Sequence, residues 1–341
     1  MGLLPTIFAK HMALDLGSSC TRIHLPQQGV VLVEPSLVAW HDWDKKVIAV
    51  GHKAWELLGR TPQQIKLIRP LAGGMVADPE MAKAMISHFF QRIQQEWKVR
   101  KPHVLISGPS DINPLSRKAI RKTAMAVGAG GAKLISQPVA AAIGAGLIPG
   151  QGPARILINL GSGTTEICLV AQGELLLSQL LRPGSDALTE ALISHIQERY
   201  QGQVGEVSAE KCKATIGSAA PSPNLPAAMD LTIKSMDSGI PQQKEIAAEP
   251  LRQALIEPLQ QLVQTINQIL EGLEQEMQDE LKTSGGLLLC GGGALLHGLP
   301  TFLSQQCGLP CGCAQDPLFT TINGCALAVE NRASYRRLFL S

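Results

Sequence analysis

The chain has 341 residues, 45% of them hydrophobic and 17% charged, which is the composition of a globular protein and excludes general disorder. Its 30 basic and 28 acidic residues give a formal net charge of +2, which provides no strong field to attract nucleic acid. The sequence contains no run of 18 apolar residues and so indicates no membrane-spanning helix. A chain of this length can form two ordinary domains, or one fold of two lobes with a cleft between them.

The first eight residues are apolar and lack the basic start and the cleavage site of a secretory signal. Their large side chains either contact a membrane surface or cover the first strand, and Pro5 interrupts any helix here. The residues concerned are Leu3, Leu4, Ile7 and Phe8.

Two later segments predict β-hairpins with tips of small residues. A strand at 12–16 runs into a Gly-Ser-Ser-Cys turn at 17–20 and then into a second strand. The same order recurs at 155–170, where an apolar strand leads into another glycine-rich turn. Because Asp15-Leu-Gly-Ser and Asn159-Leu-Gly-Ser align, the sequence indicates an internal duplication with one hairpin in each of two lobes.

Strands and helices alternate along the rest of the chain, which favours an α/β architecture. Between the hairpins, apolar periodicity predicts helices at 78–98 and 114–127. Residues 204–243 are richer in Pro, Ser and Lys and predict a small, looser subdomain with several loops. Apolar residues at helical spacing from 251 to 277 then predict one long amphipathic helix with a kink at Pro258.

Glycine-rich turns let backbone N–H groups approach a phosphate closely. The turns at 17–20 and 161–165 add hydroxyl donors and, facing each other across a cleft, could grip a polyphosphate from both sides. A third glycine loop at 291–295 lies between a buried strand and a helix and could contribute its N–H dipoles. A dinucleotide site is disfavoured because Glu166 stands where a glycine belongs, and a P-loop is disfavoured because no Gly-Lys-Ser/Thr follows a glycine cluster.

Eight cysteines are scattered without paired spacing, which favours reduced thiols in a cytosol over a disulfide framework. Cys307, Cys311 and Cys313 lie within seven residues, a spacing that suggests zinc, but no fourth ligand is evident nearby. Ordinary buried thiols are the favoured interpretation.

Longer motifs along the chain match one family. They include Asp15-Leu-Gly-Ser, Glu34-Pro-Ser-Leu-Val-Ala39, Ile68-Arg-Pro-Leu71, Pro138-Val-Ala-Ala-Ala-Ile-Gly-Ala145, Gly161-Ser-Gly-Thr-Thr-Glu166, Ala209-Glu-Lys-Cys-Lys213 and Gly291-Gly-Gly-Ala-Leu-Leu296. Through them the sequence resembles the MreB/Mbl family of bacterial actin-like proteins over about 12–330. The motifs are specific to MreB-like proteins rather than to the wider actin, Hsp70 and sugar kinase superfamily.

The resemblance implies an α/β, actin-like bilobed ATPase fold, with two duplicated mixed-sheet domains and four subdomains around a nucleotide cleft. The first lobe would comprise 1–145, with a small subdomain at about 33–66, and would be completed by 316–341. The second lobe would comprise 146–315, with a small subdomain at about 183–245.

The resemblance also implies ATP and Mg²⁺ in the cleft. Asp15 would hold Mg²⁺ through water, while Glu210 and Lys213 would face the ribose and the adenine. The residues implied in nucleotide binding are Asp15, Gly17, Ser18, Ser19, Cys20, Gly161, Ser162, Gly163, Thr164, Glu210, Lys211, Cys212, Lys213, Gly291, Gly292, Gly293, Ala294 and Leu295.

Two residues depart from the family's pattern near the γ-phosphate. Gln137 stands where MreB proteins usually have the glutamate that orients the attacking water, and Asn159 stands where they usually have aspartate. An amide can still orient water, since phosphoryl transfer depends mainly on positioning and electrostatics. Proton acceptance and negative charge toward Mg²⁺ are lost, so we expect ATP binding with slow hydrolysis.

The implied function is a cytoplasmic protein that forms paired protofilaments on the inner face of the membrane and organises cell-wall synthesis and cell shape. Its partners would be other copies of itself, other MreB-type subunits, and cell-wall or organelle membrane proteins. Leu115 lies on the helix that MreB uses between protofilaments, although a core position is the alternative. Phe89 and Phe90 are either membrane-inserting aromatics or buried helix residues.

Other functions are compatible with the same motifs. One is a filament that positions an organelle, as in the MamK relatives, and another is a hydrolysis-deficient scaffold that co-assembles with a true MreB. A small-molecule kinase or an Hsp70-like chaperone ATPase would share the fold, but no catalytic aspartate toward a sugar hydroxyl can be identified.

Overall fold

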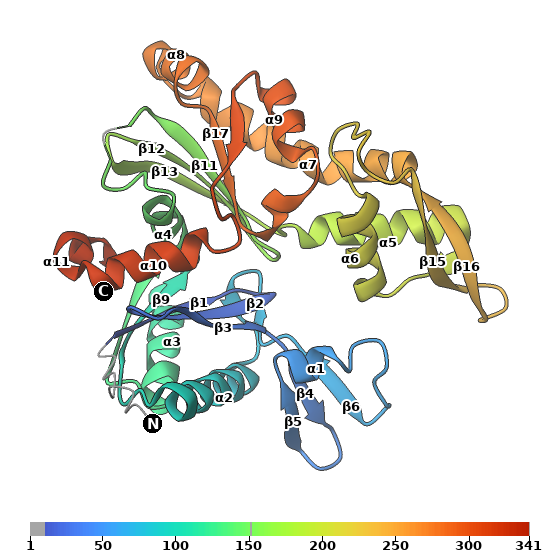
Figure 1. The fold of residues 1–341 in the computed structure, drawn as a ribbon, viewed down its shortest axis with the longest axis horizontal. Helices are drawn as coiled ribbons and strands as arrows, with labels where there is room; N and C mark the ends of the chain where they lie inside the picture. The colour runs from blue at the N-terminus through green and yellow to red at the C-terminus, as the bar shows by residue number, and fades with distance from the viewer. Residues whose placement is uncertain (1–10, 151, 341) are drawn as a thin grey trace, which may run out of the picture.

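The computed structural model describes residues 11–150 and 152–340, which form two lobes (Figure 1). The membrane prediction for Leu3, Leu4, Ile7 and Phe8 lies outside these residues. Within the described part of the chain, no helix is long and apolar enough to cross a bilayer.

A six-stranded mixed sheet in the order β19-β10-β9-β1-β2-β3 forms the first lobe. Its strands are β1 (His11–Leu16), β2 (Cys20–Leu25), β3 (Gly29–Pro35), β9 (His103–Gly108), β10 (Gly131–Ser136) and β19 (Phe339–Leu340). The strands β1 and β2 form the antiparallel hairpin expected from the sequence, and β9 lies parallel to β1. The helix α3 (Pro114–Ala126) provides the crossover between the parallel strands β9 and β10.

The helix α2 (Pro79–Trp97) also packs on this sheet. It begins after Asp78, whose carboxylate accepts hydrogen bonds from the N–H groups of Glu80 and Met81. Its apolar face includes Phe89 and Phe90, each 1% exposed in the core of the first lobe. The alternative in which these aromatic side chains insert into a membrane is therefore wrong, and their interpretation as buried helix residues is confirmed.

The second lobe repeats the plan of the first around a five-stranded sheet in the order β13-β12-β11-β17-β18. Its strands are β11 (Arg155–Leu160), β12 (Thr165–Ala171), β13 (Glu174–Leu181), β17 (Leu287–Cys290) and β18 (Cys311–Cys313). The hairpin of β11 and β12 is antiparallel, and β17 lies parallel to β11, as β9 does to β1. This shared arrangement supports the internal duplication.

The long amphipathic helix expected from 251 to 277 is two helices in the structure. The first is α7 (Ala248–Glu271), which contains Pro258, and the second is α8 (Gln275–Thr283). The break falls at Gly272, where the high conformational freedom of glycine disfavours a continuous helix. The apolar face of α7 packs into the core of the second lobe, together with α9 (Leu299–Cys307).

Each lobe carries a smaller three-stranded sheet at its outer end (Figure 1). In the first lobe it contains β4 (Val38–His41), β5 (Lys46–Val50) and β6 (Ile65–Ile68), with the short helix α1 (His52–Trp55). In the second lobe it contains β14 (Gly202–Gln203), β15 (Ala228–Ser235) and β16 (Pro241–Ala247), with α5 (Asp186–Tyr200) and α6 (Glu206–Ile216). The region at 204–243 is thus more regular than its composition suggests, and the exact lobe boundaries stay predictions. The remaining short elements are β7 (Leu71–Ala72), β8 (Met75–Val76), α11 (Arg332–Tyr335), η1 (Gly292–Leu295) and η2 (Arg336–Leu338).

Two helices, α4 (Gln137–Gly144) and α10 (Thr320–Glu330), lie between the large sheets and join the lobes (Figure 1). They share one core cluster with Ala13 of the first sheet and Leu157 of the second. Their backbones meet at two glycines: a Cβ at Gly144 would lie 1.9 Å from the carbonyl oxygen of Thr320, and a Cβ at Gly324 would lie 1.7 Å from that of Ala140. Only glycine permits so close an approach.

We expect Gly324→Ala to lower the free energy of unfolding by about 3 kcal/mol, because the added methyl group would force α4 and α10 apart. Urea unfolding measures the change. Gly312→Ala is the matched control, since a Cβ there meets no atom of the described residues within 4 Å. If both variants unfold at the urea concentration of the parent chain, the close helix contact does not exist in solution.

Candidate functional site

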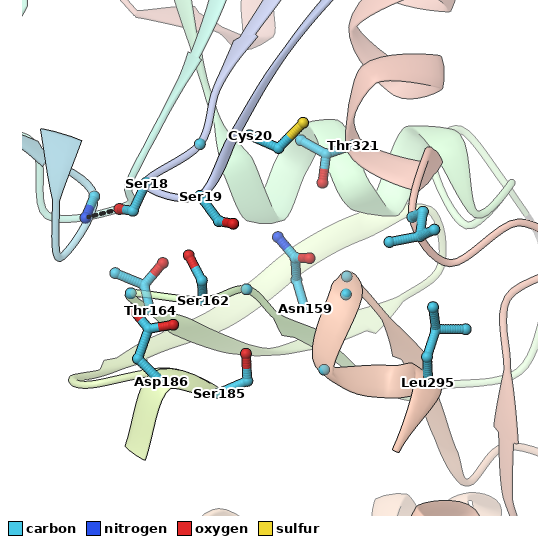
Figure 2. Close-up of a pocket in the computed structure, with 18 of the residues that line it drawn as sticks. Ser18, Ser19, Cys20, Asn159, Ser162, Thr164, Ser185, Asp186, Leu295 and Thr321 are labelled. Carbon is cyan, nitrogen blue, oxygen red and sulfur yellow. Dashed lines mark hydrogen bonds between the residues drawn. The ribbon is translucent and has the colours of Figure 1, made fainter. Parts of the chain in front are cut away.

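A cavity of about 450 Å³ lies between the two lobes and is lined by residues of both hairpins. Figure 2 shows Ser18, Ser19 and Cys20 of the first hairpin on one side of this space and Asn159, Ser162 and Thr164 of the second on the other. The sequence prediction that the two turns face each other thus agrees with the structure.

The first hairpin turn is held in shape by local hydrogen bonds. The N–H of Gly17 donates to the carbonyl oxygen of Cys20 at 3.2 Å, and the hydroxyl of Ser36 donates to the carbonyl oxygen of Gly17 at 2.6 Å. Gly17 is required here because a Cβ would lie 2.6 Å from the oxygen of Cys20. The hydroxyl of Ser18 accepts a hydrogen bond from the N–H of Gly74, whereas that of Ser19 points into the cavity (Figure 2).

The second hairpin turn has the same backbone hydrogen bond as the first. The N–H of Gly161 donates to the carbonyl oxygen of Thr164 at 2.9 Å. A Cβ at Gly163 would lie 2.8 Å from the hydroxyl oxygen of Ser18 and 2.9 Å from the backbone nitrogen of Gly73. The glycine therefore allows the two hairpins to approach each other closely.

Polar contacts join the two lobes beside the second hairpin. Arg182 of the second lobe forms a bidentate ion pair with Asp111 of the first, with N–O distances of 2.9 and 3.0 Å. The Nε of Arg182 also donates to the carbonyl oxygen of Gly73. The carboxylate of Glu166 accepts from both the N–H and the hydroxyl of Ser110. Burial raises the pKa of Glu166, although these two hydrogen bonds act in the opposite direction.

The third glycine loop also reaches the cavity, but in a different form from the one expected. Gly291 has φ of 83°, and a Cβ there would lie 2.4 Å from the carbonyl oxygen of Leu160. The loop continues as the short 3₁₀-helix η1 and not as an α-helix, because α9 begins only at Leu299. Gly291, Gly292, Gly293 and Leu295 line the cavity, whereas Ala294 is buried and does not.

The residues expected to face ribose and adenine come from α6. Lys213 donates to the carboxylate of Glu210 at 2.8 Å and to the hydroxyl of Thr189 at 2.7 Å, and both charged residues line the cavity. Lys211 and Cys212 do not, because they lie on other faces of the helix: Lys211 is exposed, and Cys212 is in the core of the second lobe. Burial raises the pKa of Cys212 to about 11.

The structure brings together the two amides that depart from the family's pattern. Gln137, at the start of α4, and Asn159, at the end of β11, both line the cavity and are largely buried. The Oδ1 of Asn159 accepts a hydrogen bond from the thiol of Cys290 at 3.6 Å, which turns its NH₂ group toward the first hairpin (Figure 2). The amide therefore presents a donor to the cavity where a carboxylate would present acceptors.

The groups at the hairpin ends do not fit a Mg²⁺ site well. In nucleotide sites Mg²⁺ is usually held in octahedral geometry by one or two carboxylates, by water and by the phosphates of the substrate. Asp15 is the carboxylate next to the first hairpin turn. Its Oδ1 accepts from the hydroxyl of Ser107 at 2.5 Å, and its Oδ2 lies 3.5 Å from Nη1 of Arg22, so both oxygens already have partners. Among the described residues no cluster of three His, Cys, Asp or Glu side chains could hold a metal, and this includes the cysteines at 307–313.

Several cavity residues were not identified from the sequence. Arg22 could have been found, because in the antiparallel hairpin it lies directly opposite Asp15. Arg69, Asp186 and Glu206 carried no such local signal, since they are brought to the cavity from distant parts of the chain by the end of β6, by α5 and by α6, respectively.

Comparisons with known proteins agree with this architecture. The family model of the MreB/Mbl protein matches residues 9–337. The cell shape-determining protein MreB of Escherichia coli (strain K12) is 34% identical over 329 residues, which cover 95% of this chain and 94% of the relative. The cell shape-determining protein Mbl of Bacillus subtilis (strain 168) is 32% identical over 327 residues, which cover 95% of this chain and 97% of the relative.

Solved structures give the same result for the fold. The structure of MreB5 of Spiroplasma citri bound to ADP has a TM-score of 0.88 and 27% identity, and the match covers 96% of this chain and 98% of that one. The structure of the MamK double helical filament has a TM-score of 0.78 and 20% identity, and the match covers 94% of this chain and 99% of that one. At this identity it supports the fold alone. The α/β bilobed fold expected from the sequence is confirmed, and the chain belongs to the MreB/Mbl protein family.

Proposed function

We propose that this chain binds an adenine nucleotide in the cavity between its lobes and polymerises into membrane-associated filaments that help to determine cell shape. The observation that carries the proposal is the pair of matched hairpin turns facing each other across the cavity (Figure 2). Backbone N–H groups and small hydroxyl side chains from both lobes can bind the same polyphosphate. A ligand held in this way joins the lobes and fixes their relative orientation.

The placement of polar groups suggests how the nucleotide would lie. Ser19, Ser162 and the NH₂ group of Asn159 would donate to phosphate oxygens at the hairpin ends. The Lys213–Glu210 pair would face the sugar and the base, next to the third glycine loop. Solved MreB5 structures bound to ADP and to AMPPNP show that a relative of the same fold holds such ligands.

The same residues suggest slow hydrolysis. Gln137 would position the attacking water, but an amide does not accept its proton. Because the donor set does not fit Mg²⁺ well, the divalent cation implied by the resemblance is not part of this proposal. A hydrolysis-deficient subunit that co-assembles with another MreB-type protein is the second candidate, favoured by Gln137 and Asn159.

Leu115 supports the part of the proposal that concerns filaments. Its side chain is 78% exposed on α3, so the structure contradicts the alternative of a core position. We expect Leu115→Glu to abolish pairing of protofilaments while leaving the fold and nucleotide binding intact, because a charge would be buried in an apolar contact. Electron microscopy of assembled protein distinguishes single from paired protofilaments.

The matched control for this variant is Leu176→Glu, which changes an exposed leucine on the second lobe. Paired filaments should persist in the control. If Leu115→Glu still forms paired protofilaments, Leu115 does not lie in the interface between them.

Sedimentation and electron microscopy of the purified chain with ATP, ADP and no nucleotide test the proposed function. We expect pelleted filaments with ATP and soluble protein without nucleotide. Protein that stays monomeric under all three conditions would refute the filament proposal, even if the nucleotide binds.

A further inference from the structure

Arg22 is a charged residue in the cavity wall for which neither the family motifs nor the proposal above provides a role. It lies on β2, and its cross-strand neighbour is Asp15, so both side chains lie on the same face of the sheet. Its side chain is 15% exposed, lines the cavity and lies over the ring of Phe319, 5.6 Å from the centroid. The ring and the strand hold the guanidinium in place at the phosphate end of the cavity.

The hydrogen-bonding capacity of Arg22 is largely unused. A guanidinium has five N–H donors. Its contact to Asp15, at 3.5 Å, is longer than a normal charge-assisted hydrogen bond, and the buried Nε has no partner within the described part of the chain. A positive group with unused donors in a cavity wall is suited to bind an anion.

The charges around Arg22 point to the same conclusion. Asp15 and Arg22 line the cavity together with the neutral amides of Gln137 and Asn159, and these four residues have no formal net charge. Other carboxylates that line the cavity are engaged elsewhere: Glu206 pairs with Arg69, and Glu210 pairs with Lys213.

The carboxylate of Asp186, at the start of α5, also lines the cavity. It lies beside Thr164 and Ser185, on the second-lobe side of the space (Figure 2). Asp15 and Asp186 therefore come from opposite lobes, which leaves Arg22 as the charged neighbour of Asp15.

We infer that Arg22 binds the phosphates of the nucleotide and supplies the counter-charge there, so that nucleotide binding does not depend on Mg²⁺. This inference rests on the proposed function. The planar fork of arginine can donate two parallel hydrogen bonds to phosphate oxygens, which gives both charge and orientation. Arg22 would supply part of the positive charge that a divalent cation otherwise brings to the phosphates.

Calorimetric titration of the full chain with ATP, in buffer with Mg²⁺ and in buffer with EDTA, tests the inference. We expect the two dissociation constants to agree within about threefold. Arg22→Met should weaken ATP binding in EDTA by about 10- to 100-fold, the loss expected for hydrogen bonds to a charged group. The double variant Arg22→Met, Asn159→Asp restores a second carboxylate and should bind ATP at least about tenfold more tightly with Mg²⁺ than with EDTA.

Arg252→Met is the matched control, since Arg252 forms an ion pair with Glu249 on α7, remote from the cavity. It should bind ATP like the parent chain in both buffers. Arg22→Lys keeps the charge and should recover part of the affinity in EDTA. If Arg22 had a purely structural role, Arg22→Met would instead lower the thermal stability of the chain without nucleotide.

Loss of ATP binding by the parent chain in EDTA alone would overturn the inference while leaving the proposed function intact, and unchanged affinity of Arg22→Met would do the same. If the parent chain binds ATP in neither buffer, the proposed nucleotide site itself is wrong. The comparison of buffers on the parent chain decides the question even if the methionine variant does not fold.

Discussion

The double variant Gln137→Glu, Asn159→Asp is expected to release phosphate from ATP about 100-fold faster than the parent chain, because a positioned general base typically contributes at least that factor. Both residues line the cavity where the phosphates would lie. The glutamate would accept the proton of the attacking water, and the aspartate would return negative charge to the hairpin end. Phosphate release under single-turnover conditions, with the chain in excess over ATP, measures the rate.

Each single variant shows which group limits the reaction. We expect Gln137→Glu alone to provide most of the acceleration, since the base acts on the water itself, and the thermal stability of every variant should match that of the parent chain. If the parent chain already releases phosphate as fast as the double variant, Gln137 and Asn159 do not make hydrolysis slow.

The variant Gly163→Val is expected to weaken ATP binding by about 10- to 100-fold. This loss corresponds to the cost of about 1–3 kcal/mol that is typical when a side chain is added at a tightly packed position. Its side chain would start 2.8 Å from the hydroxyl oxygen of Ser18 and 2.9 Å from the nitrogen of Gly73. The two hairpins would have to separate, so their donors could no longer reach the same phosphates. Equilibrium titration with ATP measures the loss, and filament formation should fail at the same nucleotide concentration.

Gly152→Val is the matched control for Gly163→Val, because a Cβ at Gly152 meets no atom of the described residues within 4 Å. Thermal unfolding without nucleotide shows whether either variant disturbs the fold. Normal ATP affinity in a folded Gly163→Val protein would mean that close approach of the hairpins is not needed for binding.

The hairpins and their turns could be predicted from the sequence because the controlling interactions are local. A strand that runs into Gly-Ser-Ser-Cys or Gly-Ser-Gly-Thr has few alternatives to a tight turn, and in both turns the N–H of the glycine pairs with the carbonyl oxygen three residues later. The repeated motif predicts the duplicated lobes without information on tertiary contacts.

Other features depend on packing between distant segments and could not be predicted in the same way. Helical periodicity placed Leu115 and Phe89 equally well in a core or on a surface, and only the neighbouring sheet decides that Phe89 is buried and Leu115 exposed. The contact of α4 with α10 joins residues that are far apart in the chain, so Gly324 carried no signal of its own. Similarly, Lys211 and Lys213 are two positions apart on α6 and therefore lie on different faces of the helix, so that Lys213 lines the cavity and Lys211 does not.

Titration of the intact chain with ATP and with adenosine tests most directly whether the paired hairpins bind phosphate. Several charge-assisted hydrogen bonds to the phosphates should make ATP bind at least about 100-fold more tightly than adenosine. Equal affinity for the two ligands, or no measurable binding of either, would contradict the account.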